Sequence, residues 1–160
     1  MNSELVSARK PGLRTNVGIM VVNGRKQVLA GEAFHYPGEW LMPQGGVGPG
    51  EALLDAMKRE LLEESGLDAC KMDMIRELDE WITYNFRKPQ LKDGVMYKGQ
   101  QQKWFLLGHN GQAPEVKACV NQEFSRFAWV DPAWLVKNTT PMLGRVYRQV
   151  LRAFEPDFPG

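Results

Sequence analysis

The chain has 160 residues, 43% of them hydrophobic and 24% charged, and a formal net charge of +1. These values are ordinary for one globular domain with a substantial core, and the near-zero charge argues against a surface that coats nucleic acid. The two cysteines are too few for a disulfide scaffold, and no apolar run reaches transmembrane length. We therefore expect no membrane partner and no DNA partner.

The N-terminal segment, residues 1–13, is polar and ends just after a Pro-Gly pair. We expect it to be a flexible lead-in to a single domain over residues 14–158. It has no signal-peptide core, which favours a cytoplasmic location. Its weak basic and serine character leaves an organellar presequence open as the alternative.

The next segments alternate between strand patterns and turn signals. An apolar strand is expected over residues 16–22, and Asn23-Gly24 is a strong hairpin turn. The returning strand should cover residues 27–33, and a short strand should lie near residues 40–42.

A glycine-rich loop and a helix follow. Gly45, Gly46, Gly48 and Gly50 prevent a regular element and allow a phosphate or backbone to approach closely. A helix should begin near Glu51 and end at Gly66. Its apolar stripe, which should pack on a sheet, is formed by Leu54, Met57 and Leu61.

The same helix carries three carboxylates on one face, because Glu60, Glu63 and Glu64 are spaced i, i+3, i+4. Such charges repel one another, and Arg59 is the cation best placed on this helix to compensate. A solvated acidic face is the usual interpretation of a glutamate-rich helix. Crowding of this kind instead favours Mg²⁺ between the carboxylates, since Mg²⁺ prefers oxygen ligands.

The second half of the chain is expected to supply further strands and two helices. Residues 72–86 should be extended, whereas residues 87–102 are polar, basic and turn-rich and are expected to form a loop that could close over substrate. The remaining expected elements are strands over 103–107 and 124–130, a loop over 110–122, a short helix after Asp131-Pro132 and a final helix from Pro141 to about Phe154. The alternation indicates an α/β protein.

The loop and helix together resemble the signature of the Nudix hydrolase superfamily. From average residue usage, chance agreement at its nine positions has a probability on the order of 10⁻⁹ per starting point. The matching positions are Gly45, Glu51, Arg59, Glu60, Leu61, Glu63, Glu64, Gly66 and Leu67. The resemblance implies the Nudix fold, a mixed curved β-sheet sandwiched between helices.

The similarity extends over roughly residues 13–154. Segments such as Trp40-Leu41-Met42-Pro43-Gln44-Gly45-Gly46 and Gly99-Gln100-Gln101-Gln102-Lys103-Trp104-Phe105 resemble bacterial RNA 5′-pyrophosphohydrolases and plant-type diadenosine tetraphosphate hydrolases. This branch implies hydrolysis of phosphoanhydrides in triphosphorylated RNA or in dinucleoside polyphosphates. We expect the protein to be a monomer or a weak homodimer. The alternative is a non-catalytic Nudix subunit that binds nucleotide or RNA within a larger complex.

The resemblance also implies roles for individual residues. Mg²⁺, with Mn²⁺ as a substitute, would bind at Gly45, Glu60, Glu63, Glu64 and Glu123. The general base would be Glu63, Glu64 or Glu123, and Arg59 would orient the glutamates through an ion pair. Substrate contacts are expected from Arg14, Gln44, Tyr84 and Lys103.

One departure from the branch falls where the substrate's base is recognised. Many relatives carry Phe-Lys-Arg or Phe-Lys-Lys ahead of the last helix, and this chain has Met142-Leu143-Gly144. We expect Met142 to contact the nucleoside end, as a flexible thioether in place of a flat ring. Discrimination among bases should therefore be weak.

Overall fold

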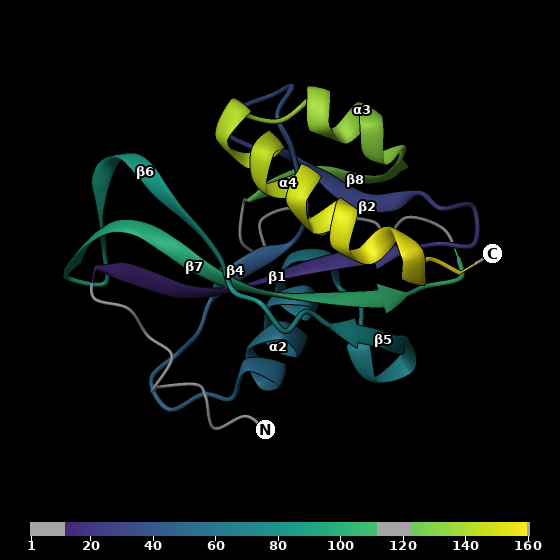
Figure 1. Ribbon diagram of the computed structural model, residues 1–160, viewed down its shortest axis with the longest axis horizontal. Helices are drawn as coiled ribbons and strands as arrows, with labels where there is room; N and C mark the ends of the chain where they lie inside the picture. Colours follow the sequence, from purple (N-terminus) through teal and green to yellow (C-terminus); the bar gives the residue numbers. More distant parts are fainter. Residues whose placement is uncertain (1–11, 112–122, 160) are drawn as a thin grey trace.

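The computed structural model describes residues 12–111 and 123–159, which form one mixed β-sheet with helices on both faces (Figure 1). In chain order the elements are β1 (Leu13–Val22), β2 (Val28–Ala33), β3 (Trp40–Leu41), β4 (Gln44–Gly46), α2 (Leu53–Ser65), η1 (Ala69–Lys71), β5 (Asp73–Glu77), β6 (Ile82–Lys92), β7 (Val95–Gly108), β8 (Phe124–Val130), α3 (Pro132–Lys137), α4 (Pro141–Phe154) and η2 (Glu155–Asp157). Nearly all of the expected lead-in and most of the expected loop over 110–122 lie outside the described residues.

The sheet is centred on β1 and β7, which run parallel, while the other strand pairs are antiparallel. Its main path is β3-β2-β1-β7-β5, and β4, β6 and β8 pair with β1, β7 and β2 respectively. The expected α/β class with a mixed sheet is confirmed. Among the described residues, no helix combines the length and apolar character needed to cross a membrane.

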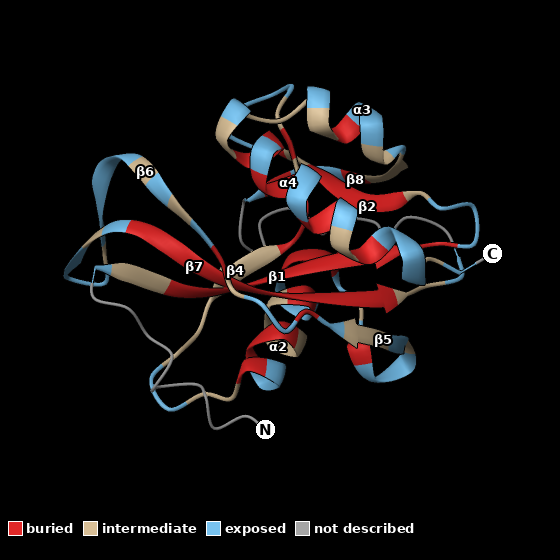
Figure 2. Ribbon diagram, viewed as in Figure 1, coloured by how far each residue is buried: buried red, intermediate tan, exposed pale blue. Residues whose placement is uncertain are grey.

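The central strands are buried on both faces, as Figure 2 shows for the middle of β1 and β7. Successive side chains of a strand point to opposite faces. Met20 and Val22 accordingly enter the core cluster under α4, whereas Ile19 and Val21 enter the cluster under α2. A strand that is apolar on both faces needs two covering layers, and α2 and α4 supply them.

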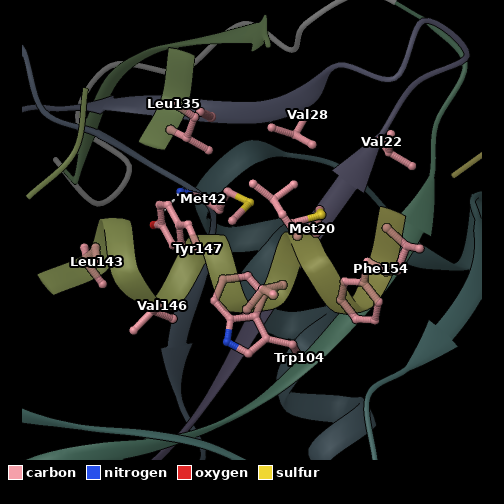
Figure 3. Close-up of a cluster of buried hydrophobic side chains, with 14 of the residues drawn as sticks. Met20, Val22, Val28, Met42, Trp104, Leu135, Leu143, Val146, Tyr147 and Phe154 are labelled. Atoms are coloured by element: carbon pink, nitrogen blue, oxygen red, sulfur yellow. Dashed lines mark hydrogen bonds between the residues drawn. The ribbon is translucent and has the colours of Figure 1, made fainter. Parts of the chain in front are cut away.

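Helix α4 covers one face through an unbroken row of apolar side chains (Figure 3). Tyr147 packs edge-on against Trp104 with ring centroids 6.0 Å apart, and its hydroxyl accepts a hydrogen bond from the Met42 backbone N–H at 3.0 Å. The helix runs from Pro141 to Phe154, which confirms the expected bounds. Its packing fixes the connection between β3 and β4, which leads into the glycine loop.

Helix α2 covers the other face, but the prediction that Leu54 belongs to its buried stripe is wrong. Met57 and Leu61 are buried, whereas Leu54 is 40% exposed and Leu53, only 4% exposed, packs inward. The buried face therefore lies one residue earlier at the start of the helix, and it continues along the helix to the buried Glu64. A carboxylate thus reaches the core side of the helix.

The expected loop over 87–102 is also wrong, because this segment belongs to the long hairpin of β6 and β7. Lys92 pairs with Val95, and the turn residues Asp93 and Gly94 have φ values of 49° and 80°. Two consecutive residues of positive φ match the two-residue turns favoured in hairpins. The polar sequence hid these strands because most side chains between residues 87 and 98 are exposed, whereas the polar Gln100, Gln101 and Gln102 are buried.

Candidate active site

A polar cavity of about 250 Å³ opens beside β4, where the glycine loop meets α2. It brings together residues that are distant in sequence, including most of those expected at the site. The lining residues are Arg14, Asn16, Leu41, Gln44, Gly45, Gly46, Glu60, Glu64, Lys92, Glu123 and Phe124.

Two of the glutamates are held against β4. The Gln44 backbone N–H donates to Oε1 of Glu64 at 3.1 Å, and Glu64 is only 7% exposed. The Glu60 carboxylate lies against the α-carbon of Gly45, so that a Cβ added there would lie 1.9 Å from Glu60 Cδ. Gly45 is therefore required by the close approach of this carboxylate.

Replacing Gly45 by Ala should displace the Glu60 carboxylate and lower kcat/KM about tenfold, because small errors in placing catalytic groups are costly. The fold should survive, since Gly45 lies at the edge of a cavity. Gly24→Ala is the matched control, because an added Cβ there meets nothing within 4 Å. Steady-state kinetics of both variants would test this, and equal activities would show that Glu60 can shift without consequence.

The carboxyls of the cavity share one electrostatic pattern. Burial raises the pKa of Glu64 well above its usual value, and the charges of Glu123 and Glu60 raise it further. Burial likewise raises the pKa of Glu60, although Arg59 opposes the shift. The pKa of Glu123, at the more open rim, is raised by desolvation against the lowering influence of Lys92 and Arg14. Burial therefore disfavours the charged form of all three carboxyls that line this cavity.

These donors fit a hard divalent cation by their chemistry. They are carboxylate oxygens in a small polar cavity, the ligands that Mg²⁺ prefers. Within residues 12–111 and 123–159, no group of three His, Cys, Asp or Glu side chains has its ligand atoms arranged for metal binding. The observation that supports a cation is thus the meeting of three carboxylates, Glu60, Glu64 and Glu123, in one small cavity.

Arg59 lies at the centre of an ion-pair network that joins the glycine loop to α2. Its guanidinium donates to both carboxylate oxygens of Glu51, at 2.8 and 2.9 Å, and to Glu60 at 2.8 Å. It also donates to Glu63 at 3.2 Å and to the Gly46 carbonyl at 2.9 Å. These contacts have the geometry expected for a residue that orients the glutamates.

Glu51 is a structural residue of the site that sequence reasoning did not assign. Its Oε1 accepts the backbone N–H of Gly48 at 2.8 Å, and the hydrogen bond from Arg59 is the main reason why its pKa is lowered. A glutamate three residues after a glycine at the start of a helix can reach back to a free backbone N–H. That spacing was the available signal.

Arg14 and Tyr84 are connected beside the cavity through Gln100. Arg14 donates to Gln100 Oε1 at 3.3 Å, and Gln100 donates in turn to the Tyr84 hydroxyl. Burial raises the pKa of Tyr84. The Arg14 guanidinium also lies against Gly46, where a Cβ would be 2.3 Å from Nη2. Arg14 thus reaches the cavity, and Tyr84 stands behind it.

A second polar chain fixes Gln44. Gln102 donates to Asn16 Oδ1 at 2.8 Å and to Gln44 Oε1 at 2.9 Å, and it accepts from the Trp104 indole at 3.1 Å. Gln100 and Gln102 were not assigned from the sequence. Three consecutive glutamines at the start of an apolar strand were the signal, because buried amides need partners.

Besides Arg59 and Tyr84, three further expected site residues do not line the cavity. Lys103 donates from Nζ to the Asp79 carbonyl at 2.8 Å and lies 3.9 Å from Glu77, and it does not line the cavity. Met142 lines a separate cleft between β6 and the start of α4. Glu63 faces Arg59 with 53% of its side chain exposed, outside the cavity lining.

Comparison with known proteins agrees with this architecture. Residues 12–154 match the NUDIX domain. The chain is 39% identical over 153 residues to the RNA pyrophosphohydrolase of Roseobacter denitrificans, covering 92% of this chain and 94% of that one. It is 35% identical over 152 residues to chloroplastic Nudix hydrolase 26 of Arabidopsis thaliana, covering 89% and 69% respectively.

Solved structures share the fold. The Ap4A hydrolase of C. elegans superposes with a TM-score of 0.64 at 20% identity, covering 89% of this chain and 99% of that one. The E. coli dihydroneopterin triphosphate pyrophosphohydrolase gives a TM-score of 0.67 at 18% identity, covering 86% and 95%. With the family match over most of its length and identity of up to 39% to named hydrolases, this chain belongs to the NUDIX family and is a Nudix hydrolase.

Proposed function

We propose that this hydrolase cleaves a phosphoanhydride at a nucleoside 5′-polyphosphate end, with Mg²⁺ as cofactor and Mn²⁺ as a substitute. The observation that carries the proposal is the cavity itself, in which Glu60, Glu64 and Glu123 meet the cations Arg14 and Lys92. Such a site can hold a divalent metal on its acidic side and phosphate oxygens on its basic side. A relative named RNA pyrophosphohydrolase at 39% identity favours a 5′-triphosphate RNA.

Glu60 and Glu64 are the proposed metal ligands, with the Gly45 backbone and Glu123 beside them. When bound, Mg²⁺ would neutralise phosphate oxygens and increase the acidity of a water. Glu64 and Glu123 both line the cavity, so either can accept the proton of an attacking water, whereas Glu63 lies outside the lining. Glu63 would act through Arg59 in this arrangement.

The basic side of the cavity would orient the polyphosphate. Arg14 presents a planar guanidinium suited to paired phosphate oxygens, and its position is set by Gln100 and Gly46. Lys92 comes from the tip region of the β6–β7 hairpin. Lys103 would contact substrate only in a state in which its Nζ no longer donates to the Asp79 carbonyl.

The nucleoside would occupy the cleft of about 730 Å³ that contains Met142. Its walls include Phe86 and Arg87 of β6 and Arg145 of α4. The Phe86 ring lies 6.1 Å from that of Tyr84, which is hydrogen-bonded through Gln100 to Arg14 of the first cavity. This chain of contacts links the phosphate end to the nucleoside end, and Phe86 is the aromatic ring that faces the same cleft as Met142.

Met142→Phe should tighten binding of a purine-ended substrate by about 0.5–1.5 kcal/mol, the usual gain from an added aromatic pair. Titration calorimetry with diadenosine tetraphosphate on a Glu64→Gln background, which does not consume the ligand, would measure it. Phe86→Ala should weaken binding, and Tyr36→Ala should not, because Tyr36 is 66% exposed and outside the cleft. Unchanged affinity in both cleft variants would place the base elsewhere.

A direct assay tests the proposed function. Purified protein with Mg²⁺ should convert a 5′-triphosphate RNA to the 5′-monophosphate, with release of pyrophosphate or of phosphate. Diadenosine tetraphosphate, a capped RNA and nucleoside triphosphates at equal concentration would rank the substrates. Tight binding without turnover of any of them would instead support the non-catalytic nucleotide-binding alternative.

A further inference from the structure

The outer face of α4 carries a row of arginines. Arg145, Arg148 and Arg152 are exposed and are spaced i, i+3, i+7, which places them along one side of the helix. At 1.5 Å per residue the row spans about 10 Å. Lys137 of α3, also exposed, lies beside it and lines the same groove as Arg148 and Arg152.

These cations have no acidic partner among the described residues. Arg59, Arg76 and Arg126 each form an ion pair of 2.8 Å with a carboxylate, but none of the three α4 arginines and no atom of Lys137 does so within residues 12–111 and 123–159. Because the whole chain has a net charge of only +1, this concentration of positive charge is local.

The row also continues from the proposed nucleoside cleft. Arg145 lines that cleft together with Arg87 and Lys88. Arg148 and Arg152 then line a groove of about 440 Å³ between α3 and α4, in which Glu155 is the one acidic lining residue. Positive charge therefore leads from the cleft along the helix to this groove.

We propose that this arginine face binds the RNA chain on the 3′ side of the 5′-terminal nucleotides. The inference rests on the proposed function and narrows its substrate class to 5′-polyphosphorylated RNA. A dinucleoside polyphosphate would be bound entirely within the cavity and the cleft, so it would not reach Arg148 and Arg152. A polynucleotide instead presents successive phosphates to which guanidinium groups bind strongly and without regard to sequence.

The test compares Arg148→Gln/Arg152→Gln with a control of equal charge, Lys58→Gln/Lys71→Gln, whose residues lie in α2 and η1. Substrates are a 5′-triphosphate RNA of 20 nucleotides, a 5′-triphosphate dinucleotide and diadenosine tetraphosphate. The arginine variant should lose about tenfold in kcat/KM on the 20-mer at low salt and less than twofold on the two short substrates. The control should match the wild type on all three.

Salt dependence and direct binding complete the test. On a Glu64→Gln background, fluorescence anisotropy with a 5′-monophosphate 20-mer should show a log Kd against log salt slope reduced by about 1.4, the value for two lost phosphate contacts on a single strand. Unchanged binding and turnover of the 20-mer, or an equal loss on the dinucleotide, would overturn the proposal.

The binding result separates this proposal from the proposed function. If the wild type hydrolyses no polyphosphate, yet the 20-mer binds and loses affinity in the arginine variant, then the RNA surface stands and the catalytic assignment fails. If hydrolysis is efficient and the arginine variant binds RNA normally, then the catalytic assignment stands and the surface fails. Selective capture of an acidic protein, with no RNA binding, would also overturn the proposal.

Discussion

Glu64→Gln is expected to lower turnover by at least about 10²-fold with saturating Mg²⁺ while leaving the protein folded. Glu64 is buried in the cavity, accepts the Gln44 backbone N–H and lies with Glu60 and Glu123. A glutamine of the same size keeps an oxygen for that N–H but loses the negative charge that would bind a cation and activate water. Steady-state kinetics over a range of Mg²⁺ concentrations would measure the loss.

Thermal unfolding of the same variant tests the physical cause. The pKa of Glu64 is raised in the folded state, so its ionisation there costs stability, and this cost appears as pH rises above the unfolded-state value. Without metal, Glu64→Gln should therefore melt at the same temperature as the wild type or higher at pH 7. Added Mg²⁺ should stabilise the wild type more than the variant. Near-normal turnover, or a large drop in metal-free stability, would contradict the assignment.

The parts of the fold that the sequence predicted are those with local signals. The glycine loop, the stop at Gly66 and the final helix from Pro141 to Phe154 depend on turn residues, capping and helical periodicity. The exposed Leu54 shows the limit of periodicity, since leucines at 53 and 54 both fit an apolar stripe and only the packing against the sheet selects Leu53.

The β6–β7 hairpin was missed although Asp93-Gly94 is a local hairpin signal, because the strands on both sides of that turn are polar. Gln102 is buried, which no local rule favours, and it is satisfied by Asn16 and Gln44, far away in sequence. In the site, too, local spacing predicted some positions, whereas contacts between distant segments determine others. Helical spacing predicted that Glu60 and Glu64 lie close together, whereas the placing of Lys103 on Asp79 depends on the path of the β5–β6 connection.

Arg59→Ala is expected to lower kcat/KM by about 10–100-fold, the usual cost of removing a residue that orients metal ligands. The guanidinium holds Glu51, Glu60 and the Gly46 carbonyl together, so it fixes both the loop and the carboxylate that approaches Gly45. Arg59→Lys should recover little activity, because one ammonium group cannot reproduce these divergent hydrogen bonds.

The matched control for this prediction is Arg76→Ala. Arg76 has nearly the same side-chain exposure, 39% against 37%, and forms an ion pair of the same length, 2.8 Å, but with Asp157 of η2, which follows α4. Its loss should lower the melting temperature only slightly and leave kcat unchanged. Since both ion pairs are partly exposed, their direct contribution to stability should be small. A selective loss of activity in Arg59→Ala, with little difference in melting temperature between the two variants, would identify Arg59 as a positioning residue. Equal kinetics in both variants would show instead that the glutamates hold their places without it.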